Sequence, residues 1–251
     1  MDMLVHNIDP VFFHIGPLEI RYYGLVYVFS FLLMYFIVRK NHKRLNLSKD
    51  AVDSLVMYAF IGMLIGARLF HFLFSDMLTL LRNPLELFMI WHGGMSFFGG
   101  LIGGALAVYL FTRKHKINFY QLDMLVIPIT LILVIGRFAN FINGEIVGTI
   151  TNLPWCFYFP GYAGCRHPYQ LYASFSHLIL FFILLIGKKV KQKGFLFWLF
   201  VTGYSGIRFI TDFLRDEPRF ISLTVWQYFC ILGFIVGLYF IIRILRKRTV
   251  S

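Results

Sequence analysis

Long apolar stretches alternate with short polar segments along almost all of the 251 residues. Seven stretches are long enough to cross roughly 30 Å of hydrocarbon as helices. They cover residues 20–38, 52–74, 95–112, 119–136, 169–187, 194–211 and 223–242. The pattern predicts an all-α polytopic membrane protein, a bundle of seven transmembrane helices forming a single membrane-embedded domain over 1–251. The longest connection, 137–168, is predicted to form a small outer cap.

The composition supports this interpretation. Apolar residues make up 59% of the chain, charged residues only 14%, and the mean hydropathy is +0.72. A soluble domain of this size cannot hide so much apolar surface, so soluble globular classes are excluded.

Basic residues gather in alternate connections. The first, third and fifth connections and the C-terminal tail hold five, three, four and four of the 24 lysines and arginines. If seven helices alternate, all four segments lie on one side, which the positive-inside rule makes cytoplasmic. We therefore expect the N-terminus outside and the C-terminus in the cytoplasm. The net charge of +12 then indicates topology, and nucleic acid is not expected as a partner.

The basic residues outside those segments are all arginines. They are Arg21, Arg68, Arg82, Arg137, Arg166, Arg208, Arg215 and Arg219. A guanidinium forms two-pronged bonds to phosphate or carboxylate, so this bias indicates anion recognition near a headgroup layer. The alternative is that lysine is absent by chance from a small sample.

The three cysteines argue against a metal site, because thiols are few and histidines are not clustered. Cys156 and Cys165 share the 137–168 connection, while Cys230 lies in the last predicted helix. An oxidising exterior permits a disulfide between the first two. Two free thiols are an equally open alternative.

The segment "GRFANFINGEIVG" places Arg137, Asn140, Asn143 and Glu145 directly after an apolar run. A charge at the centre of a bilayer costs roughly 2.5–3.5 kcal/mol on insertion scales. These groups therefore either satisfy one another as a structural knot or face a polar group that arrives.

A second intramembrane charge pair lies in the sixth predicted helix, where Asp212 follows Arg208 by four residues and shares its helix face. Under the predicted topology, Arg137 and Arg208 lie at the outer ends of their helices. With Glu145 and Asp212 nearby, they suggest a phosphate clamp held by carboxylates, or alternatively a structural tie. Arg68 either lines the same cavity or snorkels to the interface.

Glycines open the third predicted helix in "HGGMSFFGGLIGGAL". Gly99 with Gly103, and Gly100 with Gly104, have the small-xxx-small spacing that lets helix backbones approach closely in lipid. Close helix packing is the favoured interpretation. The alternative is that Gly93, Gly94, Gly99 and Gly100 clear space for a lipid headgroup.

Taken together and in order, five segments resemble the signature motifs of the prolipoprotein diacylglyceryl transferases. The segments are "DPVFFHIGPLEIRYYGLVY", "WHGGMSFFGGLIGG", "GRFANFINGEIVG", "RHPYQLY" and "IRFITDFLR", and the resemblance covers nearly the whole chain. It implies a seven-helix, multi-pass protein of the cell membrane with a site open to the outer leaflet.

The resemblance also implies a reaction. The diacylglyceryl group of phosphatidylglycerol moves to the lipobox cysteine thiol of an exported prolipoprotein, and glycerol 1-phosphate leaves. No cofactor is needed, and the partners are phosphatidylglycerol, prolipoprotein signal peptides with a lipobox cysteine, and membrane lipid.

The resemblance assigns residues by position. Matches to the signature are Arg137, Asn140, Asn143, Glu145 and Gly148; Arg208 matches a second essential arginine, Tyr23 a tyrosine of the first helix, and Asp212 a family glutamate. The arginines would neutralise the departing phosphate, Glu145 would orient Arg137, and the asparagines would donate to phosphate or glyceryl oxygens.

Three positions depart from the family pattern. Phe98 replaces a histidine favoured as the base, Ala139 a glycine, and Ala173 a glutamate. The base is therefore open among His92, His167, Tyr23 and Glu145, unless a thiolate arrives from bulk solvent.

The departures keep other functions open. In one alternative the chain is a divergent family member with a changed lipid substrate. In another it is a non-catalytic lipid-binding protein. A small-solute transporter is the rival from another class, but transporters commonly show internal repeats and polar groups near the midplane. No repeat is visible here, and the polar groups gather at predicted helix ends.

Overall fold

The computed structural model describes residues 4–15, 18–43, 45–89 and 94–249. Its contacts form two compact units, one of Met1–Met34 with Asp123–Ser251 and one of Tyr35–Leu122. Each unit is considered by itself, and the first carries most of the predicted site residues.

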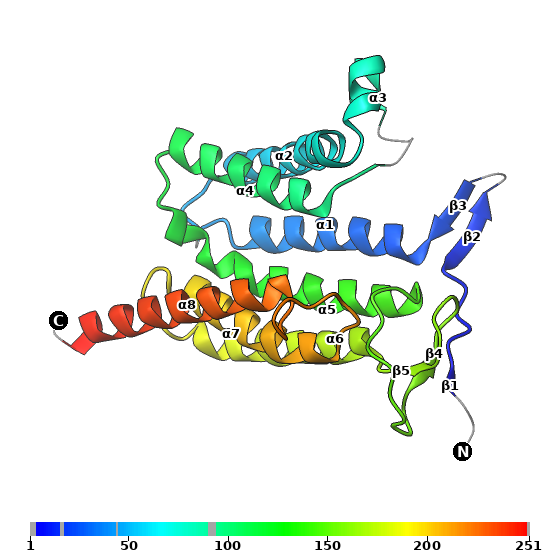
Figure 1. The fold of residues 1–251 in the computed structure, drawn as a ribbon. Coiled ribbons are helices and arrows are strands. Elements are labelled where there is room, and N and C mark those ends of the chain that lie inside the picture. Colours follow the sequence, from blue (N-terminus) through cyan, green and yellow to red (C-terminus); the bar gives the residue numbers. More distant parts are fainter. Residues whose placement is uncertain (1–3, 16–17, 44, 90–93, 250–251) are drawn as a thin grey trace. The chain divides into compact units, whose positions relative to one another are not determined.

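Each of the seven predicted stretches is largely helical. The helices are α1 (Tyr22–Lys40), α2 (Lys49–Ser75), α4 (Phe97–Lys114), α5 (Val126–Ile142), α6 (Tyr169–Gly187), α7 (Phe195–Thr211) and α8 (Val225–Thr249) (Figure 1). Shorter elements are α3 (Met77–Arg82), η1 (Pro84–Phe88), η3 (Phe119–Leu125) and η4 (Asp212–Leu214).

In the described part of the chain, four segments are long and apolar enough to cross a membrane: Lys49–Ser75, Leu122–Ile142, Tyr169–Gly187 and Val225–Arg246. The mostly helical class with candidate membrane spans is therefore confirmed. Seven crossings, the orientation of the termini and the single domain stay predictions.

Short strands add to the helices, so the fold is not strictly all-α. A three-stranded sheet joins β1 (Leu4–Val5), parallel to β4 (Phe157–Tyr158), and β5 (Cys165–Arg166), antiparallel to β4. A hairpin joins β2 (Val11–Ile15) to β3 (Leu18–Arg21). A disulfide connects Cys156 to Cys165, which decides between the two alternatives for these cysteines.

Helix α5 begins later and ends later than the apolar run predicts. Residues 119–125 form the 3-10 helix η3, and the α-helix continues through Arg137 and Asn140 to Ile142. Polar side chains do not stop a helix when they find partners; this one ends before Gly144, whose φ of +66° is left-handed. The connection to α6 therefore starts six residues later than predicted, and Arg137 and Asn140 share a helix face.

Within the first unit, α5 packs on α6, α6 on α7, and α7 on α8, and these helices lie side by side in Figure 1. In the other unit, α2 packs on α4. There, a Cβ on Gly66 would lie 2.2 Å from the carbonyl oxygen of Gly99, and one on Gly103 would lie 2.2 Å from that of Gly62. The small-xxx-small spacing thus serves helix packing; a headgroup role for Gly99 and Gly100 stays a prediction.

Arg68 has neither of its two expected roles. Its side chain is buried and donates to four backbone carbonyls of the segment after α3, those of Glu86, Leu87, Met89 and Gly94. Its guanidinium also lies over the ring of Phe72. The arginine binds carbonyls of η1 and of the residues that follow it. Buried with these partners, it neither snorkels nor faces a ligand in the described part of the chain.

Candidate active site

Two contacts set the position of α6 against α7. The hydroxyl of Tyr169 donates to Oδ1 of Asp212 at 2.8 Å. Two turns later, the ring of His177 stacks on that of Tyr204 with centroids 5.5 Å apart. Because Arg208 lies midway between Tyr204 and Asp212, it is level with the middle of the α6 segment 169–177.

A third contact sets α6 against α5. The hydroxyl of Ser174 donates to the carbonyl of Val134 at 2.9 Å, and Arg137 follows Val134 by three residues. The charges of Arg137 and Arg208 both act on Tyr169 and on His177. Arginines from two helices therefore converge on one face of α6, and we call this the two-arginine site: Arg137, Arg208 and the α6 face from Tyr169 to His177.

Arg208 forms an ion pair through its Nε. Its Nε lies 2.9 Å from Oδ2 of Asp212, and the two side chains are 11% and 0% exposed. Tyr169 occupies the other oxygen of this carboxylate, so the buried charge is fully compensated. Among the described residues, no protein group accepts from the two terminal nitrogens of Arg208, and they are available to an anion.

Two hydrogen bonds through the side chain of Asn140 connect Arg137 to Glu145. Its Nη1 lies 3.4 Å from Oδ1 of Asn140, whose Nδ2 donates to Oε1 of Glu145 at 2.8 Å. Asn143 donates to the same oxygen at 3.4 Å. Within the described ranges, Arg137 and Glu145 form no direct ion pair, so the asparagine amides hold the carboxylate. Their predicted donation to substrate oxygens would require a change of partner.

The loop after α5 is fixed by close backbone packing. The side chain of Gln170 donates to the carbonyl of Glu145 at 2.6 Å, and the amide of Gly148 donates to the carbonyl of His167 at 3.1 Å. A Cβ on Gly148 would lie 2.7 Å from the carbonyl oxygens of both His167 and Leu214. Only glycine fits here without a backbone shift, and the segment carrying Glu145 is held beside α6.

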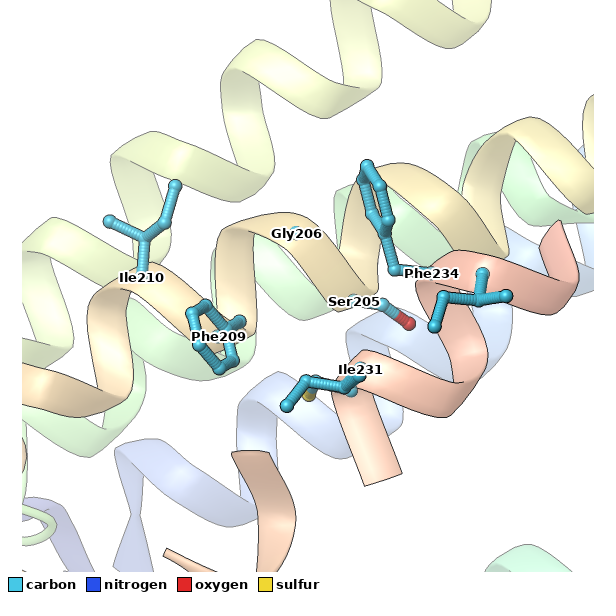
Figure 2. Close-up of a pocket in the computed structure, with 8 residues that line it drawn as sticks. Ser205, Gly206, Phe209, Ile210, Ile231 and Phe234 are labelled. Atoms are coloured by element: carbon cyan, nitrogen blue, oxygen red, sulfur yellow. The ribbon is translucent and has the colours of Figure 1, made fainter. Parts of the chain in front are cut away.

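An apolar groove of about 310 Å³ runs between α7 and α8. Figure 2 shows Phe209 and Ile210 of α7 near Ile231 and Phe234 of α8. The remaining lining residues are Ser205, Gly206, Cys230 and Ile235. The charges of Arg208 and Asp212 act on Cys230, so the groove adjoins the two-arginine site.

The paired arginines and the adjoining apolar groove agree with the family that this sequence matches. The family model of the prolipoprotein diacylglyceryl transferases matches residues 10–243. The chain belongs to this family.

Curated relatives cover nearly the same length. Proteins named phosphatidylglycerol–prolipoprotein diacylglyceryl transferase include one from Geobacter sulfurreducens, 39% identical over 97% of this chain and 98% of that protein. Others come from Idiomarina loihiensis, 42% identical over 86% and 84%, and Dechloromonas aromatica, 37% identical over 98% and 100%. The family match contains the whole two-arginine site.

Other arginines of this protein form contacts within the protein itself. Arg166 is buried, lies 2.6 Å from Asp216 and donates to the carbonyl of Gly148. Arg215 pairs with Glu217 at 3.2 Å. The arginine bias of the predicted outer half therefore includes structural ion pairs, and anion recognition by Arg137 and Arg208 stays a prediction.

Of the four base candidates, His167 is the one the structure places outside a helix as a neutral ring. Burial lowers the pKa of the His167 imidazole below its ordinary 6.5, so it is neutral at pH 7 and can accept a proton. The hydroxyl of Tyr172 lies 3.3 Å from Nδ1. His92 and the side chain of Tyr23 lie outside the described residues. Glu145 already accepts two amide hydrogen bonds.

Sequence reasoning missed three polar residues of α6 that belong to this site: Tyr169, Gln170 and His177, all buried. A signal was available for His177, because an ionisable residue within a long apolar helix is a functional candidate by default. Tyr169 and Gln170 lie within the quoted segment "RHPYQLY", but the sequence did not show the contact of Tyr169 with Asp212.

Proposed function

We propose that this protein transfers the diacylglyceryl group of phosphatidylglycerol to the thiol of a lipobox cysteine in an exported prolipoprotein, releasing glycerol 1-phosphate. Family membership and the names of the curated relatives support the reaction. The observation that carries the mechanism is the convergence of Arg137 and Arg208 on one face of α6, where no described residue accepts a hydrogen bond from the terminal nitrogens of Arg208.

The change in phosphate charge during the reaction explains why the site holds two arginines. The thiolate sulfur forms a bond to the glyceryl carbon while the bond from that carbon to the phosphate oxygen breaks. The phosphate thereby changes from a diester with one negative charge to a monoester that develops a second. Guanidinium groups already in place stabilise this growing charge, and a low-dielectric site makes them more effective.

The thiol must lose its proton, because the thiolate is the nucleophile. We assign this step to His167, whose neutral ring is next to the segment of Gly148. Glu145 is a weaker candidate because its Oε1 already accepts hydrogen bonds from the amides of Asn140 and Asn143. The protein needs no cofactor in this scheme.

The groove between α7 and α8 is proposed to hold an acyl chain of the lipid. Its lining is apolar apart from Ser205 and the Cys230 thiol, and it adjoins Arg208. An acyl chain in this groove would leave its phosphate near the guanidinium. We further propose seven crossings of the cell membrane, an outside N-terminus, a cytoplasmic C-terminus and a site facing the outer leaflet.

The test is direct. The purified protein is incubated with phosphatidylglycerol and a lipobox peptide, and mass spectrometry measures the peptide. We expect a diacylglyceryl mass increase on the cysteine peptide, release of glycerol phosphate, and no change in a matched serine peptide. A folded protein that binds the lipid without modifying the peptide would instead be a non-catalytic lipid-binding member, the alternative suggested by Phe98.

A further inference from the structure

His177 is a buried histidine that the mechanism above does not use. It lies near the middle of α6, its side chain is 2% exposed, and it stacks on Tyr204. Within the described residues, neither ring nitrogen has a hydrogen-bond partner. The carbonyl of Ala173, one turn earlier, interacts with the ring but does not reach hydrogen-bond geometry.

Such an arrangement indicates a missing partner. Buried polar atoms in folded proteins are almost always hydrogen-bonded to protein, water or a ligand. Here two unpartnered nitrogens belong to one ring, and that ring lies where Arg137 and Arg208 both act on it. The partner therefore enters the two-arginine site.

The neighbouring charges define the partner's chemistry. Like charges repel in a buried site, so the neutral imidazole is the form compatible with two nearby guanidinium groups. A neutral imidazole has one donor and one acceptor nitrogen. A partner able to bond to either nitrogen must be able both to accept and to donate, as a hydroxyl does.

Phospholipid headgroups differ in this respect. An ionised phosphate diester has only acceptors, and choline has no N–H or O–H donor. Ethanolamine offers only donors and would bring a third positive charge to the arginines. The glycerol headgroup of phosphatidylglycerol carries two hydroxyls and no charge.

We propose that His177 binds a hydroxyl of the headgroup glycerol while Arg137 and Arg208 hold the adjoining phosphate, and that this contact selects phosphatidylglycerol over other phospholipids. The inference rests on the proposed transfer reaction. The geometry agrees, because Tyr169, Ala173 and His177 share one face of α6 at intervals of four residues and Arg208 is level with Ala173. A phosphate at the arginines thus has His177 one helical turn away.

The experiment compares two lipids that differ only in the hydroxyls: phosphatidylglycerol and phosphatidylpropanol, whose propyl headgroup has none. Variants are His177→Phe, which keeps a flat ring against Tyr204, and His177→Gln, which restores a donor and an acceptor. Ser176→Ala is the matched control, since that hydroxyl bonds to the carbonyl of Tyr172 in its own helix. Thermal stability is measured for every variant.

We expect the unchanged protein to prefer phosphatidylglycerol in kcat/KM by about tenfold to a hundredfold, the usual effect of one buried hydrogen bond to a substrate. His177→Phe should lose this preference by lowering the value for phosphatidylglycerol alone. His177→Gln should recover part of it, and Ser176→Ala should keep it.

Equal losses with both lipids in His177→Phe, or an unchanged preference, would overturn the proposal and leave His177 a packing residue. If the unchanged protein transfers neither lipid, the transfer function itself fails. The His177 contact is then judged from binding of short-chain forms of the two lipids, where equal affinities would refute it. If His177→Phe does not fold, His177→Gln decides: with no loss in stability it must retain a preference for phosphatidylglycerol.

Discussion

At the scale of single residues, Nε and the terminal nitrogens of the Arg208 guanidinium have different surroundings. Its Nε binds Asp212, whose carboxylate is completely buried, and no described protein group accepts a hydrogen bond from its terminal nitrogens. Arg137 has a similar division, with Nη1 directed weakly at Asn140. A planar guanidinium can serve two partners in fixed directions, whereas an ammonium is a single point charge.

Lysine should therefore fail at both positions. We expect Arg137→Lys and Arg208→Lys each to lower turnover on the order of 10²–10³-fold, the usual effect of losing one preorganised donor. The measurement is the transfer rate at saturating phosphatidylglycerol, with thermal stability alongside. Arg219→Lys is the control, because that exposed arginine contacts only Phe213 among the described residues. Near-normal turnover in both site variants would remove the phosphate clamp from the mechanism.

At the scale of elements, the connection between α5 and α6 is held in a defined conformation by its own packing. Its segment at Gly148 lies between the backbones of residues 167 and 214, and the disulfide and the sheet of β1, β4 and β5 hold the rest. The position of Glu145 depends on this packing, because the loop has no helix of its own.

We predict that Gly148→Ala destabilises the protein by about 1–3 kcal/mol, as overpacking typically does, and lowers transfer because the Glu145 segment moves. Thermal unfolding and the transfer assay measure the two effects. Gly136→Ala is the matched comparison, since no atom lies within 4 Å of a Cβ there and an alanine suits a helix. A Gly148→Ala variant as stable as Gly136→Ala would show that the loop relaxes freely.

At the scale of the whole molecule, the distribution of basic residues is the main evidence for orientation. Five, three, four and four lysines and arginines lie in alternate connections and in the tail, whereas the two-arginine site lies at the other ends of α5 and α7. The positive-inside rule thus predicts that the site lies on the outer side, where we expect exported prolipoproteins to arrive.

Reporter fusions test this orientation. A reporter active only outside the cytoplasm should work when fused within the 143–168 connection and fail when fused after residue 116 or residue 193. A cytoplasmic reporter should give the opposite pattern, and expression of each fusion is measured as the control. A cytoplasmic 143–168 connection would contradict the outer-leaflet site along with the topology.

Local patterns in the sequence determined the helices and the family. A long apolar run must be buried or span a membrane wherever it lies, so the seven helices were predictable. Most of their ends fall within three residues of the prediction, but α5 is shifted towards the C-terminus and α8 extends to Thr249. The ion pair of Arg208 with Asp212 was also predictable, because residues four apart share a helix face. The ordered motifs carried the family resemblance without any knowledge of packing.

Only the tertiary structure decided which distant groups meet. The sequence left the pairing of Cys156 with Cys165 open and gave Arg68 the wrong role. It did not indicate that the hydroxyl of Tyr169 binds the second carboxylate oxygen of Asp212. It also did not show that the Asn140 amide stands between Arg137 and Glu145. These contacts depend on how one helix is rotated and shifted against the next, which the packing of many side chains sets together. Periodicity along a single helix fixes which residues share a face, but not what that face meets.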